Sequence, residues 1–179
     1  MIKKLVLVVV LIGIAGCDTM KPEDFAGREP NLLIEDYFAG RTKAWGLFHD
    51  RFGQLRRQFE VEIDGRWDGE TLTLVEDFLY DDGEEEQRIW RIRKTGDHTY
   101  EGRADDVIGV ARGSGYGNAF YWTYRYDLKV GGSTWTVTFD DWLFLQSDGV
   151  LINRAEVTKF GIKLGEVTLV FRKLPELST

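Results

Sequence analysis

The sequence has few of the residues that usually mark a metal centre or a nucleophilic enzyme. It contains one cysteine and two histidines among 179 residues. A single cysteine cannot form an intramolecular disulfide, and neither His49 nor His98 has partners at a metal-ligand spacing. No serine stands in a nucleophile-elbow motif. We therefore expect no metal, no cofactor and no catalytic residue, and we take the protein as a non-enzyme.

Positive charge and long apolar runs are also scarce. The chain has 30 acidic and 23 basic residues, with a net charge of −7. An acidic chain argues against binding to nucleic acid and against a broad electrostatic attraction to anionic lipid. Beyond the N-terminus no apolar run reaches the roughly 20 residues that a membrane-spanning helix needs. The function classes left are those of a globular domain outside the bilayer.

The first 16 residues have the composition of a secretory signal. Lys3 and Lys4 precede an apolar stretch, and small residues lead to Cys17. The sequence IAGC at 14–17 resembles the bacterial lipobox. The resemblance implies cleavage before Cys17 and acylation of this residue, so that membrane lipid is a partner and the protein is anchored without spanning the bilayer. The alternative is an ordinary secretory peptide in which Cys17 is incidental.

The mature chain then divides into a tether and one domain. Removing residues 1–16, with their two lysines, changes the net charge from −7 to −9. Residues 17–30 are polar enough for a lipidated tether, and 31–179 have the length of a single domain. Asp18 resembles an inner-membrane retention signal of enteric-type bacteria. It implies a protein that faces the periplasm from the inner membrane, with the outer membrane as the alternative.

Alternation of apolar and polar residues predicts strands through most of residues 41–173. The clearest strand is AFYWTYRYDLKV at 119–130, where aromatic and apolar side chains share one face. The Gly-Gly pair at 131–132 is a hairpin signal. Trp135 and Phe139 then continue the inner face on the following strand.

The number and spacing of these strands predict the fold class. About ten strands joined by short turns exceed what a flat sheet usually carries without curling or splitting. We therefore expect an all-β antiparallel meander that forms a closed or nearly closed lipocalin-like barrel, preceded by one short helix within 32–38. The same pattern permits a β-sandwich as the alternative. A barrel of this size can hold one small ligand.

The C-terminal third resembles an uncharacterised bacterial lipoprotein family, domain-of-unknown-function family 3833. The similarity lies in FDDWLFLQSDGVLINRAEVTKFGIKLGEVTLVFRK at 139–173, and FAGRTKAWGLFHDRFG at 38–53 also fits. Within the longer segment it is carried by Asp141-Trp142, Asn153-Arg154-Ala155, Lys159-Phe160-Gly161 and Gly165-Glu166-Val167. The family implies no activity. A looser similarity to lipocalins rests on Gly40 and Trp45, whose spacing departs from the lipocalin Gly-x-Trp motif.

The aromatic strand and its neighbours supply the candidate binding site. These side chains either fill a solid core or line an apolar cavity that accepts a small hydrophobic ligand. Asp141 falls on the inner face, where a carboxylate is costly unless it is paired, and Arg154 is the expected partner. Asp141 is then a structural ion pair, an outward-turned bulge residue, a head-group anchor or an acid–base group. The candidate ligand-binding residues are Phe120, Trp122, Tyr124, Tyr126, Trp135, Phe139, Asp141 and Arg154.

Three functions fit these observations. The first is a periplasmic lipoprotein whose barrel binds or shuttles a hydrophobic ligand such as a fatty acid or a phospholipid. The second is a non-enzymatic accessory lipoprotein that acts by protein–protein contact, with a partner that the sequence does not identify. The third is a lipid-modifying enzyme. A connected apolar cavity would favour the first, and perturbed polar groups inside it would favour the third.

Overall fold

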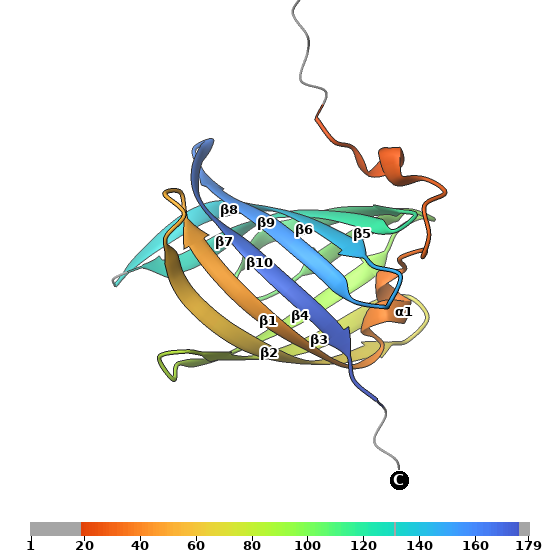
Figure 1. Ribbon diagram of the computed structural model, residues 1–179, viewed down its shortest axis with the longest axis horizontal. Helices are drawn as coiled ribbons and strands as arrows, with labels where there is room; N and C mark the ends of the chain where they lie inside the picture. The colour runs from red at the N-terminus through yellow and green to blue at the C-terminus, as the bar shows by residue number, and fades with distance from the viewer. Residues whose placement is uncertain (1–18, 131, 176–179) are drawn as a thin grey trace, which may run out of the picture.

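The computed structural model describes residues 19–130 and 132–175, so that Cys17 and Asp18 lie outside the described residues. Within these ranges ten antiparallel strands form a closed barrel, in which each strand pairs with its chain neighbours and β1 pairs with β10 (Figure 1). The predicted meander barrel is confirmed, and the β-sandwich alternative is wrong. The strands are β1 (Gly40–Asp50), β2 (Leu55–Trp67), β3 (Thr71–Tyr80), β4 (Glu85–Lys94), β5 (Thr99–Arg103), β6 (Val107–Tyr116), β7 (Ala119–Val130), β8 (Ser133–Leu145), β9 (Leu151–Lys159) and β10 (Ile162–Lys173).

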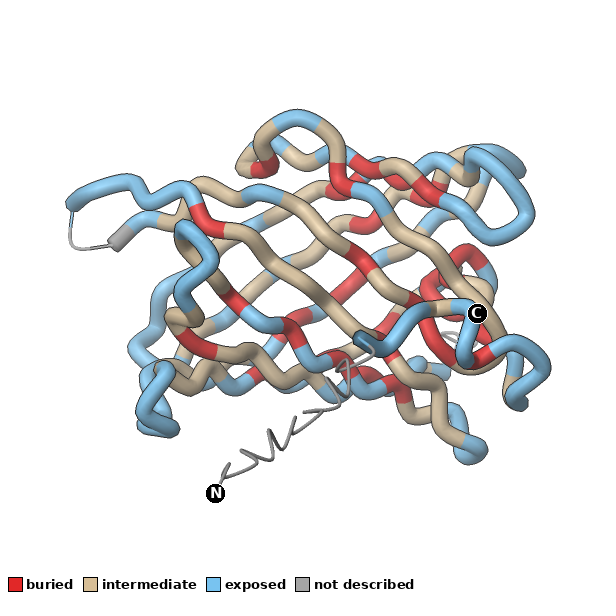
Figure 2. The backbone as a smooth tube through the Cα atoms, turned by 90° about the horizontal axis from the view of Figure 1, so that it is seen from above, coloured by how far each residue is buried: buried red, intermediate tan, exposed pale blue. Residues whose placement is uncertain are grey.

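Side chains alternate between the inside and the outside of the barrel along each strand. On β2, Val61 and Ile63 are buried, whereas Glu60 and Glu62 are exposed. Figure 2 shows the same alternation along other strands, with exposed residues gathered in the hairpin loops. The period of two in the sequence therefore reports which residues face the interior.

A short helix, α1 (Ile34–Phe38), closes one end of the barrel (Figure 1). Ile34 and Phe38 enter the hydrophobic core. Glu35 is 5% exposed and accepts hydrogen bonds from Lys94 at 2.6 Å and from the Tyr100 hydroxyl at 2.9 Å. Burial opposes ionisation of Glu35, but these donors outweigh it and lower its pKa. The ion pair holds the helix in place as a plug.

The segment before α1 lies against the outer wall. It contains a 3-10 turn, η1 (Pro22–Phe25), and Phe25 is 8% exposed because it packs against Trp142 and Phe144 of β8. The backbone N–H of Leu32 donates to the Gly117 carbonyl at 2.7 Å. Part of the segment predicted as a polar tether therefore contacts the barrel. Among the residues that the structure describes, no helix is long and apolar enough to cross a bilayer.

Candidate functional site

The barrel encloses a cavity of about 220 Å³. Its wall is mostly aromatic and aliphatic, and α1 closes it at one end through Ile34 and Phe38. Two ring pairs form much of this wall: Trp90 with Trp122, and Tyr124 stacked on Phe139 with ring centroids 5.2 Å apart. The interior is thus a hollow lined by rings and not a solid core.

The cavity continues into a mouth at the end of the barrel away from α1. This mouth has a volume of about 460 Å³ and shares five lining residues with the cavity: Phe78, Tyr80, Arg88, Tyr126 and Leu128. It lies where the strand pairing of the wall is incomplete, because β4 pairs with β5 only from Arg91 to Lys94. The first half of β4 therefore faces β7 and the turn before β6 across this mouth.

Arg88 crosses this space and reaches the interior. Its Nε donates to Asp106 Oδ2 at 2.8 Å, and its Nη2 donates to the Tyr126 hydroxyl at 2.9 Å. The guanidinium also lies over the rings of Phe78 and Tyr126. Burial works against its charge, but Glu76 and the other nearby acidic and phenolic groups raise the pKa of Arg88 further. The guanidinium stays charged and already has partners on two sides.

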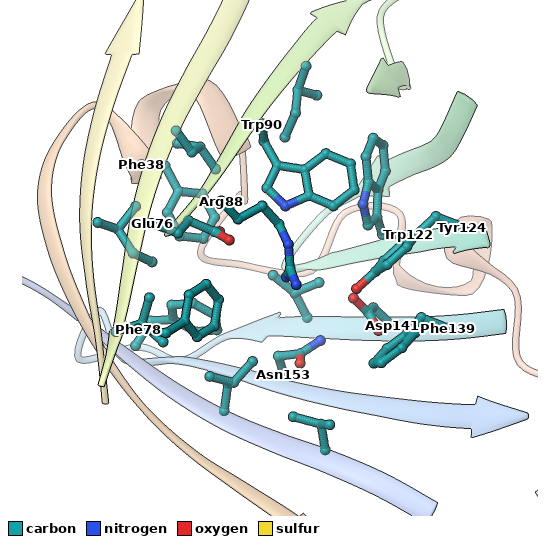
Figure 3. Close-up of a pocket in the computed structure, with 18 of the residues that line it drawn as sticks. Phe38, Glu76, Phe78, Arg88, Trp90, Trp122, Tyr124, Phe139, Asp141 and Asn153 are labelled. Carbon is teal, nitrogen blue, oxygen red and sulfur yellow. The ribbon is translucent and has the colours of Figure 1, made fainter. Parts of the chain in front are cut away.

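Two carboxyl groups, Glu76 on β3 and Asp141 on β8, face Arg88 from different walls (Figure 3). Burial raises the pKa of Glu76 to about 7, although Arg88 acts in the opposite direction. Burial and the neighbouring Asp140 raise the pKa of Asp141 to about 8. Both side chains are therefore able to gain or lose a proton near neutral pH.

Two buried hydrogen-bond acceptors in the cavity, one on β8 and one on β9, have no hydrogen-bond partner among the described residues. Asp141 accepts a hydrogen bond from Tyr124, but its Oδ1 has no partner among the described residues. Asn153 is 2% exposed, and its Nδ2 donates to the Trp142 carbonyl at 3.4 Å. Its Oδ1 is likewise buried and unpartnered within the described chain. Such groups are costly unless something binds them.

Six of the eight candidate ligand-binding residues line the cavity. They are Phe120, Trp122, Tyr124, Tyr126, Phe139 and Asp141. Their role in binding stays a prediction.

The other two expectations are corrected. Trp135 is 38% exposed near the β7–β8 hairpin, where its ring lies under the Lys159 ammonium at 4.2 Å. Arg154 points outward and pairs with Glu166 at 2.8 Å, because Asp141 lies opposite Ala155 in the β8–β9 register. The predicted Asp141–Arg154 pair is therefore wrong, and Arg88 is the cation near Asp141.

Three polar residues of the cavity escaped sequence reasoning: Glu76, Arg88 and Asn153. A signal existed for the two charged residues. Glu76 has the phase of Leu74 and Phe78 on β3, and Arg88 has the phase of Trp90 on β4. A charged residue on the inner face of a strand is unusual enough to mark a site.

The fold and its cavity define a class: a lipocalin-like antiparallel β-barrel with a hollow interior. Within this class the chain belongs to the family described as "Protein of unknown function (DUF3833)", whose model matches residues 11–173. The resemblance noted in the sequence is thereby confirmed. Among solved structures, the chain is similar to the S-type phycobiliprotein lyase CPES from Guillardia theta. The TM-score is 0.57 at 10% sequence identity, over 81% of this chain and 92% of that chain, which shows a shared fold.

Proposed function

We propose that the protein binds and carries a small hydrophobic ligand inside its barrel, at the surface of a membrane. The observation that carries the proposal is the aromatic cavity of about 220 Å³ with its open mouth. Ligand sites are typically concave, apolar and equipped with a few converging polar groups. The chain of a lipid such as a fatty acid or a phospholipid fits this description. The similar barrel of a phycobiliprotein lyase supports handling of a small molecule by analogy of fold.

The membrane part of the proposal rests on Cys17. We propose that Cys17 is acylated and is the first residue of the mature protein, and that Asp18 retains it in the inner membrane with the barrel in the periplasm. A Cys17→Ser variant should lose labelling by a palmitate analogue and leave the membrane fraction. An Asp18→Ser variant should move to the outer membrane. Unchanged labelling of Cys17→Ser would refute the anchor, and unchanged fractionation of Asp18→Ser would refute the sorting signal.

An apolar stripe on the outer wall supports this placement. Four outward-facing side chains are direct register partners across four neighbouring strands, and three of them are at least 36% exposed. We call them the outer stripe: Phe144 on β8, Ile152 on β9, Val170 on β10 and Trp45 on β1. Exposed apolar patches of this kind mark contacts with a protein or a membrane.

The chain between the anchor and the outer stripe is short. Phe25 lies eight positions after Cys17 and packs on Phe144 at one end of the stripe. At about 3.5 Å per residue, an acyl group on Cys17 stays within about 28 Å of Phe25. We therefore assign the outer stripe to the outer surface of the lipid bilayer. Tryptophan, as in Trp45, is favoured at the membrane–water interface.

Ligand binding can be tested on residues 19–179, which we call the barrel chain. It keeps the closed barrel, the α1 plug and Phe25, and thus every contact described above. The probe is N-phenyl-1-naphthylamine, a neutral apolar dye that fluoresces when it leaves water. We expect a saturable rise in fluorescence with one dye per chain. A fluorescence rise that stays linear with dye concentration would refute the proposal.

Two neighbours on β10 provide a matched pair of variants. Leu169 lines the cavity, whereas Val170 faces outward. Leu169→Trp should fill the cavity and abolish dye binding, and Val170→Trp should leave it unchanged. If Leu169→Trp does not fold, Val167→Phe fills the cavity from the same strand with a smaller increase in side-chain volume. Equal dye binding by the inward and outward variants would place the dye outside the barrel.

The raised pKa values of Glu76 and Asp141 favour a second candidate, an enzyme that uses them as acid and base on a bound lipid. Groups that titrate near neutral pH are suited to proton transfer. Incubation of the barrel chain with an extract of envelope lipids, followed by mass spectrometry, separates the candidates. A new product that forms with wild type and not with Asp141→Asn indicates an enzyme. Lipid bound and released unchanged indicates a carrier.

A further inference from the structure

We propose that the cavity selects ligands whose polar end donates hydrogen bonds, an amine above all, and disfavours ligands that end in a carboxylate. This inference rests on the proposed ligand binding and names the chemistry of the ligand's head. It follows from a count of the donors and acceptors that face the cavity, together with the charges around them.

Above about pH 8, where Asp141 is ionised, the polar groups left without partners are acceptors. Asp141 Oδ1 and Asn153 Oδ1 are buried without a hydrogen-bond partner among the described residues. The orientation of the Asn153 amide is set by its Nδ2, which donates to the Trp142 carbonyl, so that turning the amide over would place two oxygens together. Figure 3 shows Glu76 and Asp141 on opposite sides of Arg88, and Asn153 on a further strand that lines the same cavity. A ligand that satisfies these oxygens must supply N–H or O–H groups.

The charged groups around the cavity also favour an amine over a carboxylate. Among the described residues that line the cavity, Arg88 is the one cation, and it is already held by Asp106 and Tyr126. Three carboxyl groups act on this guanidinium: Asp106, Glu76 and Asp141. A ligand carboxylate would compete with Asp106 for Arg88 and would lie beside the other two acids. Above about pH 8, where Glu76 and Asp141 are ionised, these like charges at close range are unfavourable, and burial makes this worse.

The walls around these acceptors add to the preference. Tyr124 lies beside Asp141, and the rings of Trp90 and Trp122 line the same cavity (Figure 3). Aromatic faces attract cations, and they do so more strongly where water is excluded. An ammonium group next to Asp141 would therefore gain a charged hydrogen bond and aromatic contacts together. The apolar remainder of the ligand would lie along the Phe59 and Phe78 side of the cavity.

The test uses three probes with one twelve-carbon chain and different heads: dodecylamine, dodecanol and dodecanoate. Each displaces N-phenyl-1-naphthylamine from the barrel chain at pH 9, where Asp141 and Glu76 are ionised, and at concentrations below its micelle concentration. We expect dodecylamine to bind at least tenfold more tightly than dodecanoate, with dodecanol between them. Hydrogen bonds to charged groups are strong enough for such a difference.

Two variants of adjacent residues separate the site from general charge. Asp141→Asn removes the inner carboxylate and should weaken dodecylamine at least tenfold, while dodecanol changes by less than about threefold. Asp140→Asn makes the same charge change on the other face of β8, where Asp140 accepts from Tyr121 at 2.6 Å. We expect this control to change no probe by more than about threefold, because the partly buried Asp140 lies outside the cavity and charges near the surface interact weakly.

Each possible result of these displacement measurements supports or refutes the preference for an amine. If the dye itself does not bind, both the proposed function and this inference fail. If dodecanoate binds as tightly as dodecylamine, or if Asp141→Asn leaves dodecylamine unaffected, the carrier function stands and this inference is overturned. If Asp141→Asn does not fold, Asn153→Asp takes its place. It adds a carboxylate beside the same space and should tighten dodecylamine and weaken dodecanoate, and the absence of both effects would refute the preference.

Discussion

Replacing Asp141 by asparagine should make the stability of the barrel less dependent on pH. The folded state raises the pKa of Asp141 from 3.8 to about 8, chiefly through burial. Between these two values the native state binds a proton that the unfolded chain releases. The free energy of unfolding contributed by this group is therefore highest below pH 3.8, falls as pH rises through the window, and is constant above about pH 8. Asparagine has nearly the same shape and no charge, and it removes this slope.

The shift sets an upper limit on the effect. About four pKa units at 1.36 kcal/mol each correspond to roughly 5 kcal/mol. Relaxation of the barrel and entry of water into the mouth lower the measurable value, so that we expect about 2–3 kcal/mol. Asp141→Asn should then match wild type within about 1 kcal/mol at pH 4 and exceed it by about 2–3 kcal/mol at pH 9. Glu76 keeps a smaller slope in the variant, because its pKa is raised from 4.5 to about 7.

Urea unfolding of the barrel chain, followed by tryptophan fluorescence at five pH values from 4 to 9, measures this difference. Asp77→Asn is the control, since it removes an exposed carboxylate of β3 that is not among the groups acting on Asp141. Its curve should stay parallel to that of wild type within about 0.5 kcal/mol. If Asp141→Asn also stays parallel to wild type, Asp141 is ionised and solvated in the folded state. The reasoning about the buried acceptor would then be refuted.

Three further predictions concern the plug, the mouth and the outer wall. A side chain at Gly65 would collide with the Phe38 carbonyl, so that Gly65→Val should displace α1, cost about 1–3 kcal/mol and speed hydrogen exchange in the plug; unchanged exchange would contradict this packing. Arg88→Met leaves Asp106 without its buried partner, and we expect the free energy of unfolding in urea at pH 7 to fall by about 2–3 kcal/mol. This is less than for a fully buried pair, because Asp106 is 33% exposed. A more stable variant would show that the pair is not needed for folding. Trp45→Glu should reduce co-flotation of the barrel chain with neutral lipid vesicles and change stability by less than about 0.5 kcal/mol; equal flotation would remove Trp45 from the membrane contact.

The inner face of the barrel was predictable where one strand carries a clear alternation. On β7 every second residue from Phe120 to Leu128 lines the cavity, as the period of two requires. Trp135 has the same phase on β8 but lies beyond the enclosed part of the barrel. Period gives the side of the sheet on which a residue lies and not the height along the barrel, which depends on strand length and stagger.

The partner of Asp141 was not predictable for a related reason. Sequence places Arg154 on the next strand, but pairing across strands depends on register, and the register sets Asp141 opposite Ala155. A register that differs by one residue would move Arg154 to the inner face. Arg88 lies 53 positions before Asp141 and meets it only because the barrel closes. Such contacts depend on topology, which no local pattern contains.

The buried charged groups and the unfilled space inside the barrel both lower the stability of the fold. Apolar side chains in place of the whole set of Glu76, Arg88 and Asp141 would avoid the desolvation of charged groups, and replacing a complete buried ion pair in this way is often neutral or stabilising. The rings around them leave space and so give up packing energy as well. Both costs fall on the same few residues, at the point where the cavity meets its mouth. A bound ligand would recover both, since it fills the space and supplies donors to Asp141 and Asn153. Ligand binding therefore accounts for the hollow and for its unpaired acceptors with a single cause, whereas a purely structural barrel would need a separate reason for each.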